Sequence, residues 1–185
     1  MLPGRLTRWK GHTVFLEALA KLGRDDLCAV IVGDPQGRAR YMTELETIVR
    51  ERGLEAIVRL VGPSNDMPAV FMAADFVVSA STDPEAFGRV IAEAGAMGRP
   101  VIASDHGGAI EQIVEGRTGW LVPPGDADAL AAAIDRALAI DQDRRATMAD
   151  AAMRRVRRHF SKEAMCRQTL SVYRSLCSAD EAADA

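Results

Sequence analysis

Residues 76–104, FVVSASTDPEAFGRVIAEAGAMGRPVIAS, predict the fold of the chain. The stretch opens with the apolar run of residues 76–79, which has the length and composition of a buried strand. After a polar loop, apolar residues recur at helical spacing over residues 87–97. Gly98 and Pro100 end that helix, and the apolar run of residues 101–103 follows it. A strand, a helix and a second strand in this order indicate a βαβ unit with two parallel strands.

The same alternation extends on both sides of this unit. Short apolar runs bounded by turn residues predict further strands over residues 27–32, 57–61 and 119–122, and residues 1–6 resemble the end of a first strand. Amphipathic spacing predicts helices over residues 13–22, 38–52, 66–73, 107–115, 126–139, 144–159 and 162–176. Buried strands joined by helices predict an α/β fold, a Rossmann-like doubly wound parallel sheet with C-terminal helices.

Length and composition fit one domain. A chain of 185 residues with 48% hydrophobic residues can bury a core. We expect a Rossmann-like domain with its C-terminal helices over residues 1–176, and a disordered tail over residues 177–185. The formal charge of −3 gives no reason to expect a nucleic-acid partner. An arginine-rich run over residues 154–158 is surrounded by acidic residues, which favours a solvated helix face over a membrane patch.

The three cysteines, Cys28, Cys166 and Cys177, follow neither a disulfide framework nor a metal-ligand spacing. Cys28 lies in an apolar run, so we expect it in the core. This usage is typical of a reduced, cytoplasmic protein. No apolar run approaches the ~20 residues that span a bilayer. We therefore expect a soluble protein, and a peripheral contact of the full-length protein with the inner face of a membrane stays open.

The functional site is expected just beyond the carboxyl ends of the strands, where open parallel sheets bind their ligands. Most of the segments there contain glycine, which permits close approach of the backbone to a ligand. These segments are Gly4-Arg5, Gly33-Asp34, Gly62-Pro63 and residues 79–88, 104–108 and 123–125.

One of these segments, residues 81–88, joins a strand to the N-terminus of a helix. Free backbone N–H groups and the helix dipole favour an anion there, and a diphosphate suits the place. Glu85 lies in the loop, where its carboxylate would accept hydrogen bonds from sugar hydroxyls. Glu93, further along the helix, can hold two vicinal hydroxyls, as an acidic residue does for ribose in dinucleotide-binding folds. Ordinary helix acids exposed to solvent are the alternative.

Two cations flank the turn after the first strand. Arg5 and Lys10 can converge on one diphosphate, which arginine can bind through two parallel hydrogen bonds. Surface cations without a ligand are the alternative. In another turn, the amides of Gly107 and Gly108 could bind phosphate or sugar, or the glycines could only allow a sharp entry into the next helix. His106 there has no second ligand at metal-binding spacing, so we expect no metal site and a loop role.

In this order, the segments resemble the C-terminal, donor-binding domain of the retaining glycosyltransferases of family 4 (glycosyl transferases group 1), which have the two-domain GT-B fold. The resemblance covers roughly residues 3–175. It rests on the segments GRLTRWKGH, VIVGDPQG, VRLVGPSNDMPAVFMAADFVVSAS and DPEAFGRVIAEAGAMGRPVIASDHGGAIEQIVEGRTGWLVPPGD.

The resemblance implies that Arg5, Lys10 and Glu85 are the catalytic residues, with no metal and no other cofactor. Arg5 and Lys10 would bind the donor diphosphate, Glu93 the ribose hydroxyls, and the loop around Glu85 the transferred sugar. Val90 would lie near the ribose and phosphate, and the end of the strand before Pro63 would flank the nucleobase. The implied donor-binding set is Gly4, Arg5, Lys10, Gly33, Val61, Gly62, Pro63, Glu85, Ala86, Phe87, Gly88, Val90 and Glu93.

The implied function is the donor half of a retaining, metal-independent hexosyltransferase for polysaccharide biosynthesis, with a UDP- or GDP-sugar as donor and a glycan or glycolipid acceptor. The N-terminal acceptor domain is absent from the chain, so we expect the chain alone to be inactive. A stand-alone nucleotide-sugar-binding module, or another GT-B enzyme such as a glycogen or sucrose synthase relative or a sugar epimerase, are the alternatives. Family members commonly have glycine where this chain has Ala86, which would cost about 1 kcal/mol if the position needed a positive φ.

Overall fold

The computed structural model describes residues 1–37 and 39–183. In this part of the chain six short strands form the sheet: β1 (Leu2–Pro3), β2 (Ala29–Val32), β3 (Val58–Val61), β4 (Val77–Ser79), β5 (Val101–Ser104) and β6 (Gly119–Val122). They pair in parallel in the orders β1-β2-β3 and β4-β5-β6. The N–H of Val78 donates to the carbonyl oxygen of Met1 at 2.8 Å, which places β4 beside β1. The order 3-2-1-4-5-6 confirms the predicted doubly wound sheet.

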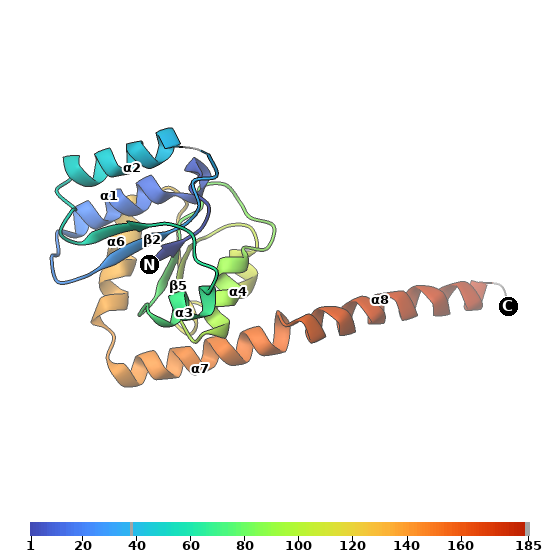
Figure 1. Cartoon of the computed structure of the whole chain (residues 1–185). Helices are drawn as coiled ribbons and strands as arrows, with labels where there is room; N and C mark the ends of the chain where they lie inside the picture. The colour runs from blue at the N-terminus through green and yellow to red at the C-terminus, as the bar shows by residue number, and fades with distance from the viewer. Residues whose placement is uncertain (38, 184–185) are drawn as a thin grey trace.

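Helices cover both faces of this sheet (Figure 1). The first face carries α1 (His12–Leu22), α2 (Ala39–Glu51) and α6 (Ala127–Ala139), and the second carries α3 (Met67–Met72), α4 (Arg89–Ala96) and α5 (Ala109–Gln112). A single 3-10 turn, η1 (Arg8–Lys10), precedes α1. The chain ends in α7 (Gln142–His159), which packs on α4, and α8 (Lys162–Ala183).

Two apolar cores follow from the alternation of side chains along buried strands. In β4, Val78 joins the core under α1 and α6, whereas Val77 joins the core under α4. In β5, Ile102 belongs to the first core, and its neighbours Val101 and Ala103 belong to the second. Because both faces of these strands are buried, their residues are apolar at successive positions rather than at alternate ones, up to the serine that ends each strand.

Aspartates begin three of the helices. The carboxylate of Asp66 accepts from the N–H of Ala69 at 3.1 Å, and Asp126 and Asp141 cap α6 and α7 in the same way. Each cap satisfies an N–H group that the first turn of a helix leaves without a partner. The predicted role of Asp66 as a cap is confirmed.

The C-terminal helix α8 projects away from the body of the molecule (Figure 1). Ala164 near its start is buried, but the side chains of residues 165–177 are exposed. The helix continues past residue 176, where we expected it to end, as far as Ala183, and residues 178–183 contain no glycine or proline that would break it. The predicted end of the last helix at residue 176 is thus wrong. The predicted disorder of residues 177–185 stays a prediction, and residues 184–185 lie outside the described residues.

Cys28 is exposed, so its predicted place in the core is wrong. The reason is that β2 begins only at Ala29, and Cys28 lies at the open, amino-terminal edge of the sheet, where it lines a cavity. Among the described residues, no helix is both long and apolar enough to cross a membrane.

Candidate donor-binding site

A cavity of about 300 Å³ opens where the carboxyl ends of β1, β2 and β3 meet the first turn of α4. This is the edge at which the sheet reverses its strand order, because β1 and β4 are neighbours there. Many residues that the sequence predicted separately share its wall. The lining residues are Pro3, Gly4, Arg5, Lys10, Val32, Gly33, Pro63, Ser64, Met67, Arg89, Val90 and Glu93.

The close spacing of β1 and β2 at this cavity depends on Gly33. A Cβ atom at Gly33 would lie 1.8 Å from the carbonyl oxygen of Gly4, which no side chain can tolerate. The N–H of Gly4 in turn donates to the carbonyl oxygen of Val32 at 2.8 Å. The glycine at the end of β2 therefore allows the turn that carries Arg5 to fold back over the strand end.

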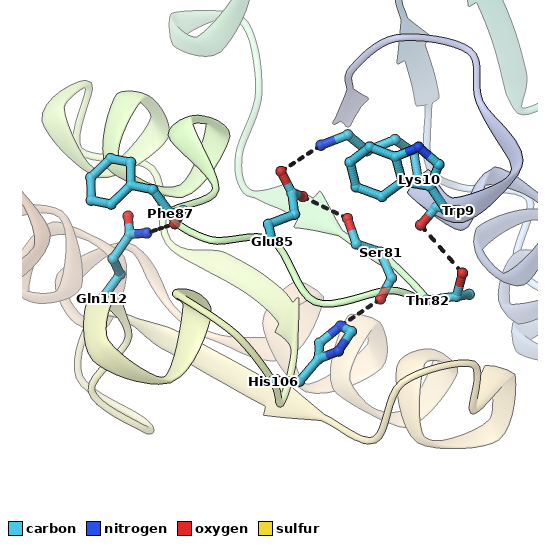
Figure 2. A network of polar contacts seen from close by, with 8 residues as sticks. All are labelled: Trp9, Lys10, Ser81, Thr82, Glu85, Phe87, His106 and Gln112. Atoms are coloured by element: carbon cyan, nitrogen blue, oxygen red, sulfur yellow. Dashed lines mark hydrogen bonds and ion pairs between the residues drawn. The ribbon is translucent and has the colours of Figure 1, made fainter.

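Lys10 and Glu85 form an ion pair beside the cavity, although 75 positions separate them in the sequence. Lys10 Nζ lies 2.7 Å from Glu85 Oε2, and both side chains are largely buried, at 12% and 21% exposure. The other oxygen, Glu85 Oε1, accepts a hydrogen bond from Ser81 Oγ at 2.7 Å (Figure 2). Lys10 Nζ also lies 4.5 Å from the centre of the Trp9 ring. Both oxygens of the carboxylate are thus held in fixed directions.

Backbone contacts join the two loops that carry this pair. The N–H of Thr82 donates to the carbonyl oxygen of Trp9 at 2.7 Å. The Thr82 hydroxyl donates to the same oxygen at 3.3 Å, and His106 Nε2 donates to the carbonyl oxygen of Ser81 at 2.9 Å (Figure 2). His106 therefore holds the loop of Ser81 from the far side, in keeping with the loop role expected for it. Among the described residues, no group of three or more histidine, cysteine, aspartate or glutamate side chains could hold a metal ion.

The Gly107-Gly108 turn supports the Glu85 loop. The N–H of Gly108 donates to the carbonyl oxygen of Glu85 at 2.8 Å, so this amide is already engaged. A Cβ atom at Gly108 would lie 2.6 Å from the carbonyl oxygen of Phe87, and one at Gly107 would lie 2.4 Å from that of Glu85. The geometry thus favours a structural role for this turn over ligand binding, and the structural role is close packing of backbone against backbone rather than only the sharp helix entry that the sequence suggested.

Phe87 is not among the residues that line the cavity. Its ring packs edge to face on Phe160, with ring centres 5.9 Å apart, and its carbonyl oxygen accepts from the side-chain amide of Gln112 (Figure 2). Ala86 is not among the residues with a positive φ. The strain expected for alanine at this position is therefore absent, because its backbone adopts a conformation open to any residue.

The remaining predicted residues lie near the cavity but outside its wall. Glu85 and Gly88 border a narrow crevice behind it, together with Ser81 and His106. Val61 and Gly62 line a second, larger cavity of about 630 Å³, which meets the first at Val32, Pro63 and Ser64. The larger cavity is mainly apolar and follows the sheet down to its amino-terminal edge. The smaller cavity is lined by four charged side chains, those of Arg5, Lys10, Arg89 and Glu93.

Two further residues of the site were not identified as functional from the sequence. Ser81 was predicted only as part of its loop, because its partner Glu85 could be identified only once the turn was folded. Arg89 follows the predicted Gly88 and lines the cavity, with Nη2 at 2.7 Å and Nε at 3.0 Å from Glu93 Oε1. The separation of Arg89 and Glu93 by one helical turn was a legible signal for this pair.

A family model described as glycosyl transferases group 1 matches residues 2–155. The chain belongs to this family. The D-inositol 3-phosphate glycosyltransferase of Corynebacterium urealyticum is 36% identical to it over 180 residues, which are 94% of the chain and 42% of that protein.

Solved structures of glycosyl transferases agree with this membership. The crystal structure of a glycosyltransferase from Rickettsia africae has a TM-score of 0.89 and 36% identity, over 95% of this chain and 47% of that one. HepE of Anabaena, solved in complex with UDP, has a TM-score of 0.86 and 34% identity, over 94% of this chain and 48% of that one. The group 1 chain thus spans less than half the length of these proteins, and its fold is one half of the GT-B architecture, as expected.

Proposed function

We propose that the cavity binds a nucleoside-diphosphate sugar, and that the chain is the donor-binding part of a retaining, metal-independent hexosyltransferase. The observation that carries the proposal is the set of cations and carboxylates on and directly beside one strand-end cavity. Arg5, Lys10 and Arg89 supply positive charge, and Glu85 and Glu93 supply acceptors for hydroxyl groups. A diphosphate flanked by two sugars presents the complementary chemistry, and UDP bound to HepE of Anabaena supports the choice of ligand.

The cations would act on the diphosphate that leaves when the sugar is transferred. Arg5 is exposed and has no ion-pair partner among the described residues, so its guanidinium can bind phosphate with two parallel hydrogen bonds. Lys10 is less exposed, and its partly buried surroundings strengthen the electrostatic attraction between its ammonium group and a phosphate. Fixed positive groups stabilise the negative charge that develops on a departing diphosphate. A metal ion has this role in metal-dependent enzymes.

The carboxylates would position the two sugars. Glu85, oriented by Ser81 and Lys10, would accept hydrogen bonds from the hydroxyls of the transferred sugar, and Glu93 on α4 would accept from the ribose. The acceptor, a glycan or glycolipid, would be bound by another domain, so the chain alone would bind the donor without transferring it. The full-length protein would act in the cytoplasm, at the membrane face where such acceptors are assembled.

Calorimetric titration of the chain with UDP, GDP and ADP tests this proposal. We expect at least one of them to bind with a Kd below about 1 mM, and Lys10→Ala to weaken that binding about tenfold or more, because a charge-assisted hydrogen bond is lost. Lys21→Ala is the matched control, since Lys21 pairs with Asp128 on the surface of α1 and α6. Absence of binding by all three nucleotides at millimolar concentration would falsify the proposal.

A further inference from the structure

Arg89 is the first residue of α4 and one of the three cations on the wall of the cavity. Both of its contacting nitrogens, Nε at 3.0 Å and Nη2 at 2.7 Å, lie against the same oxygen of Glu93. The Arg89 side chain is 83% exposed, so it can change rotamer at little cost. In the structure, Arg89 therefore pairs with the Glu93 carboxylate, the group that we proposed to bind the ribose hydroxyls.

Helix stability does not explain this arrangement. A cation in the first turn of a helix opposes the helix dipole, and the first turn of α4 contains no acidic residue. In a pair one turn apart, the more stabilising order places the glutamate before the cation, whereas here Arg89 precedes Glu93. Both effects are small: the first opposes the helix, and the second makes the pair less stabilising than the reverse order.

The position of Arg89 in the cavity gives it a different partner once a donor is present. Arg5 and Lys10 come from the turn after β1, and Arg89 faces the same space from α4. Arg89 lies one turn nearer the start of the helix than Glu93, on the side where an anion is favoured. In a nucleoside diphosphate, the phosphate next to the ribose is the group closest to a carboxylate that binds the ribose hydroxyls.

We propose that Arg89 is a further donor-binding residue, which leaves Glu93 and binds the ribose-linked phosphate when the ribose hydroxyls take its place on the carboxylate. This inference rests on the proposed function of the cavity. The exchange leaves both charged groups hydrogen-bonded: the carboxylate gains two hydroxyl donors, and the guanidinium gains phosphate oxygens that match its planar set of N–H groups. Arg89 then completes a triad of cations around the diphosphate.

Titration of Arg89→Ala with the nucleoside diphosphate that the wild-type chain binds best tests the inference. We expect about tenfold weaker binding, the loss of one charge-assisted contact. If Arg89 only occupied Glu93, its removal would free the carboxylate, and binding would be unchanged or tighter; that result overturns the inference while the proposed function stands. Arg154→Ala is the matched control, because Arg154 forms an exposed helical pair with Asp150 on α7, away from the cavity.

A double-mutant cycle separates contact with phosphate from an effect through Glu93. In the Glu93→Gln background, Arg89→Ala should again weaken binding about tenfold if the guanidinium binds phosphate directly. If Arg89 acts only by orienting Glu93, the second substitution will have no further effect, and the inference fails. Failure of the wild-type chain to bind any of the three nucleotides contradicts the proposed function, and this inference falls with it.

Discussion

Ser81 is buried beneath the site and directs its hydroxyl at Glu85 Oε1. We expect Ser81→Ala to weaken binding of UDP-glucose about tenfold and to leave binding of UDP within about twofold of the wild-type value, since a hydrogen bond to a charged group contributes ~1.5–3 kcal/mol. The physical reason is that the freed carboxylate loses its orientation toward the sugar, whereas the diphosphate cations are unchanged. Parallel calorimetric titrations measure both ligands, with Ser175→Ala on exposed α8 as the control. Equal weakening for UDP and UDP-glucose would contradict the assignment of Glu85 to the sugar.

His12 begins α1 next to Lys10 and is fully buried, with Nδ1 3.4 Å from the hydroxyl of Tyr41. Burial lowers the pKa of its imidazole from 6.5 to about 4. The unfolded chain therefore takes up a proton at higher pH than the folded one, and the neutral ring stabilises the fold above pH 6.5. This stability is lost as the pH falls from 6.5 toward 4, by about 3 kcal/mol in total.

Urea unfolding of the wild-type chain and of His12→Gln across this pH range measures the effect. We expect the free energy of unfolding of the wild-type chain to fall more steeply below pH 6.5, because the variant lacks the imidazole that must be protonated. Carboxylates that titrate in the same range contribute equally to both proteins, so the difference in slope isolates His12. Identical slopes would show that burial of this histidine does not govern the acid sensitivity.

At this scale the sequence predicted the principal charges of the cavity but not their partners. Arg5, Lys10, Glu85 and Glu93 were identifiable because they follow strands or a helix start. The pairing of Lys10 with Glu85 spans 75 positions and depends on how β1 and β4 come together. No local pattern records such a contact. Ser81 and Arg89 are different, because each lies only four residues from its carboxylate partner, Glu85 or Glu93, and for Arg89 this spacing on a helix was a legible signal.

At the scale of elements, the loop of Glu85 depends on the turn beneath it. In Gly108→Ala, the added Cβ would lie 2.6–2.8 Å from backbone atoms of Ala86 and Phe87, so the loop must move. We expect nucleotide binding to weaken at least about tenfold, with destabilisation of the order of 1–3 kcal/mol, typical of overpacking. Calorimetry and thermal unfolding of the same sample measure the two effects. Unchanged binding despite a lower Tm would show that the turn serves stability alone.

Elements with strong periodicity were predictable, and their ends were less so. The βαβ unit of β4, α4 and β5 was found because its strands are apolar on both faces and its helix is amphipathic. The place of Cys28 was predicted wrongly, because an apolar run does not reveal where strand pairing begins. The role of the Gly107-Gly108 turn could not be predicted either, because the sequence does not distinguish a glycine needed for close packing from one that lets the backbone approach a ligand.

At the scale of the whole molecule, the doubly wound order brings the ends of β1, β2 and β3 to the start of α4, and this crossing creates the charged cavity. The same architecture leaves a larger apolar cavity on the lower part of the sheet. These two cavities differ in chemistry, because Arg5, Lys10, Arg89 and Glu93 line the smaller one and the lining of the larger one is mainly apolar. A nucleoside diphosphate needs both cations and acceptors for its hydroxyl groups, and the smaller cavity supplies them at the ends of the strands.

Amide chemical-shift mapping of the 15N-labelled chain during titration with UDP distinguishes these two cavities directly. We predict that the largest shifts fall on residues at the charged cavity and its loop, Gly4, Arg5, Gly33, Gly88, Val90 and Glu93. Residues that line only the apolar cavity, such as Leu19, Leu27 and Ala74, should remain unshifted. Shifts that gather on the apolar cavity, or no shifts at millimolar UDP, would contradict the assignment of this strand-end site to the donor.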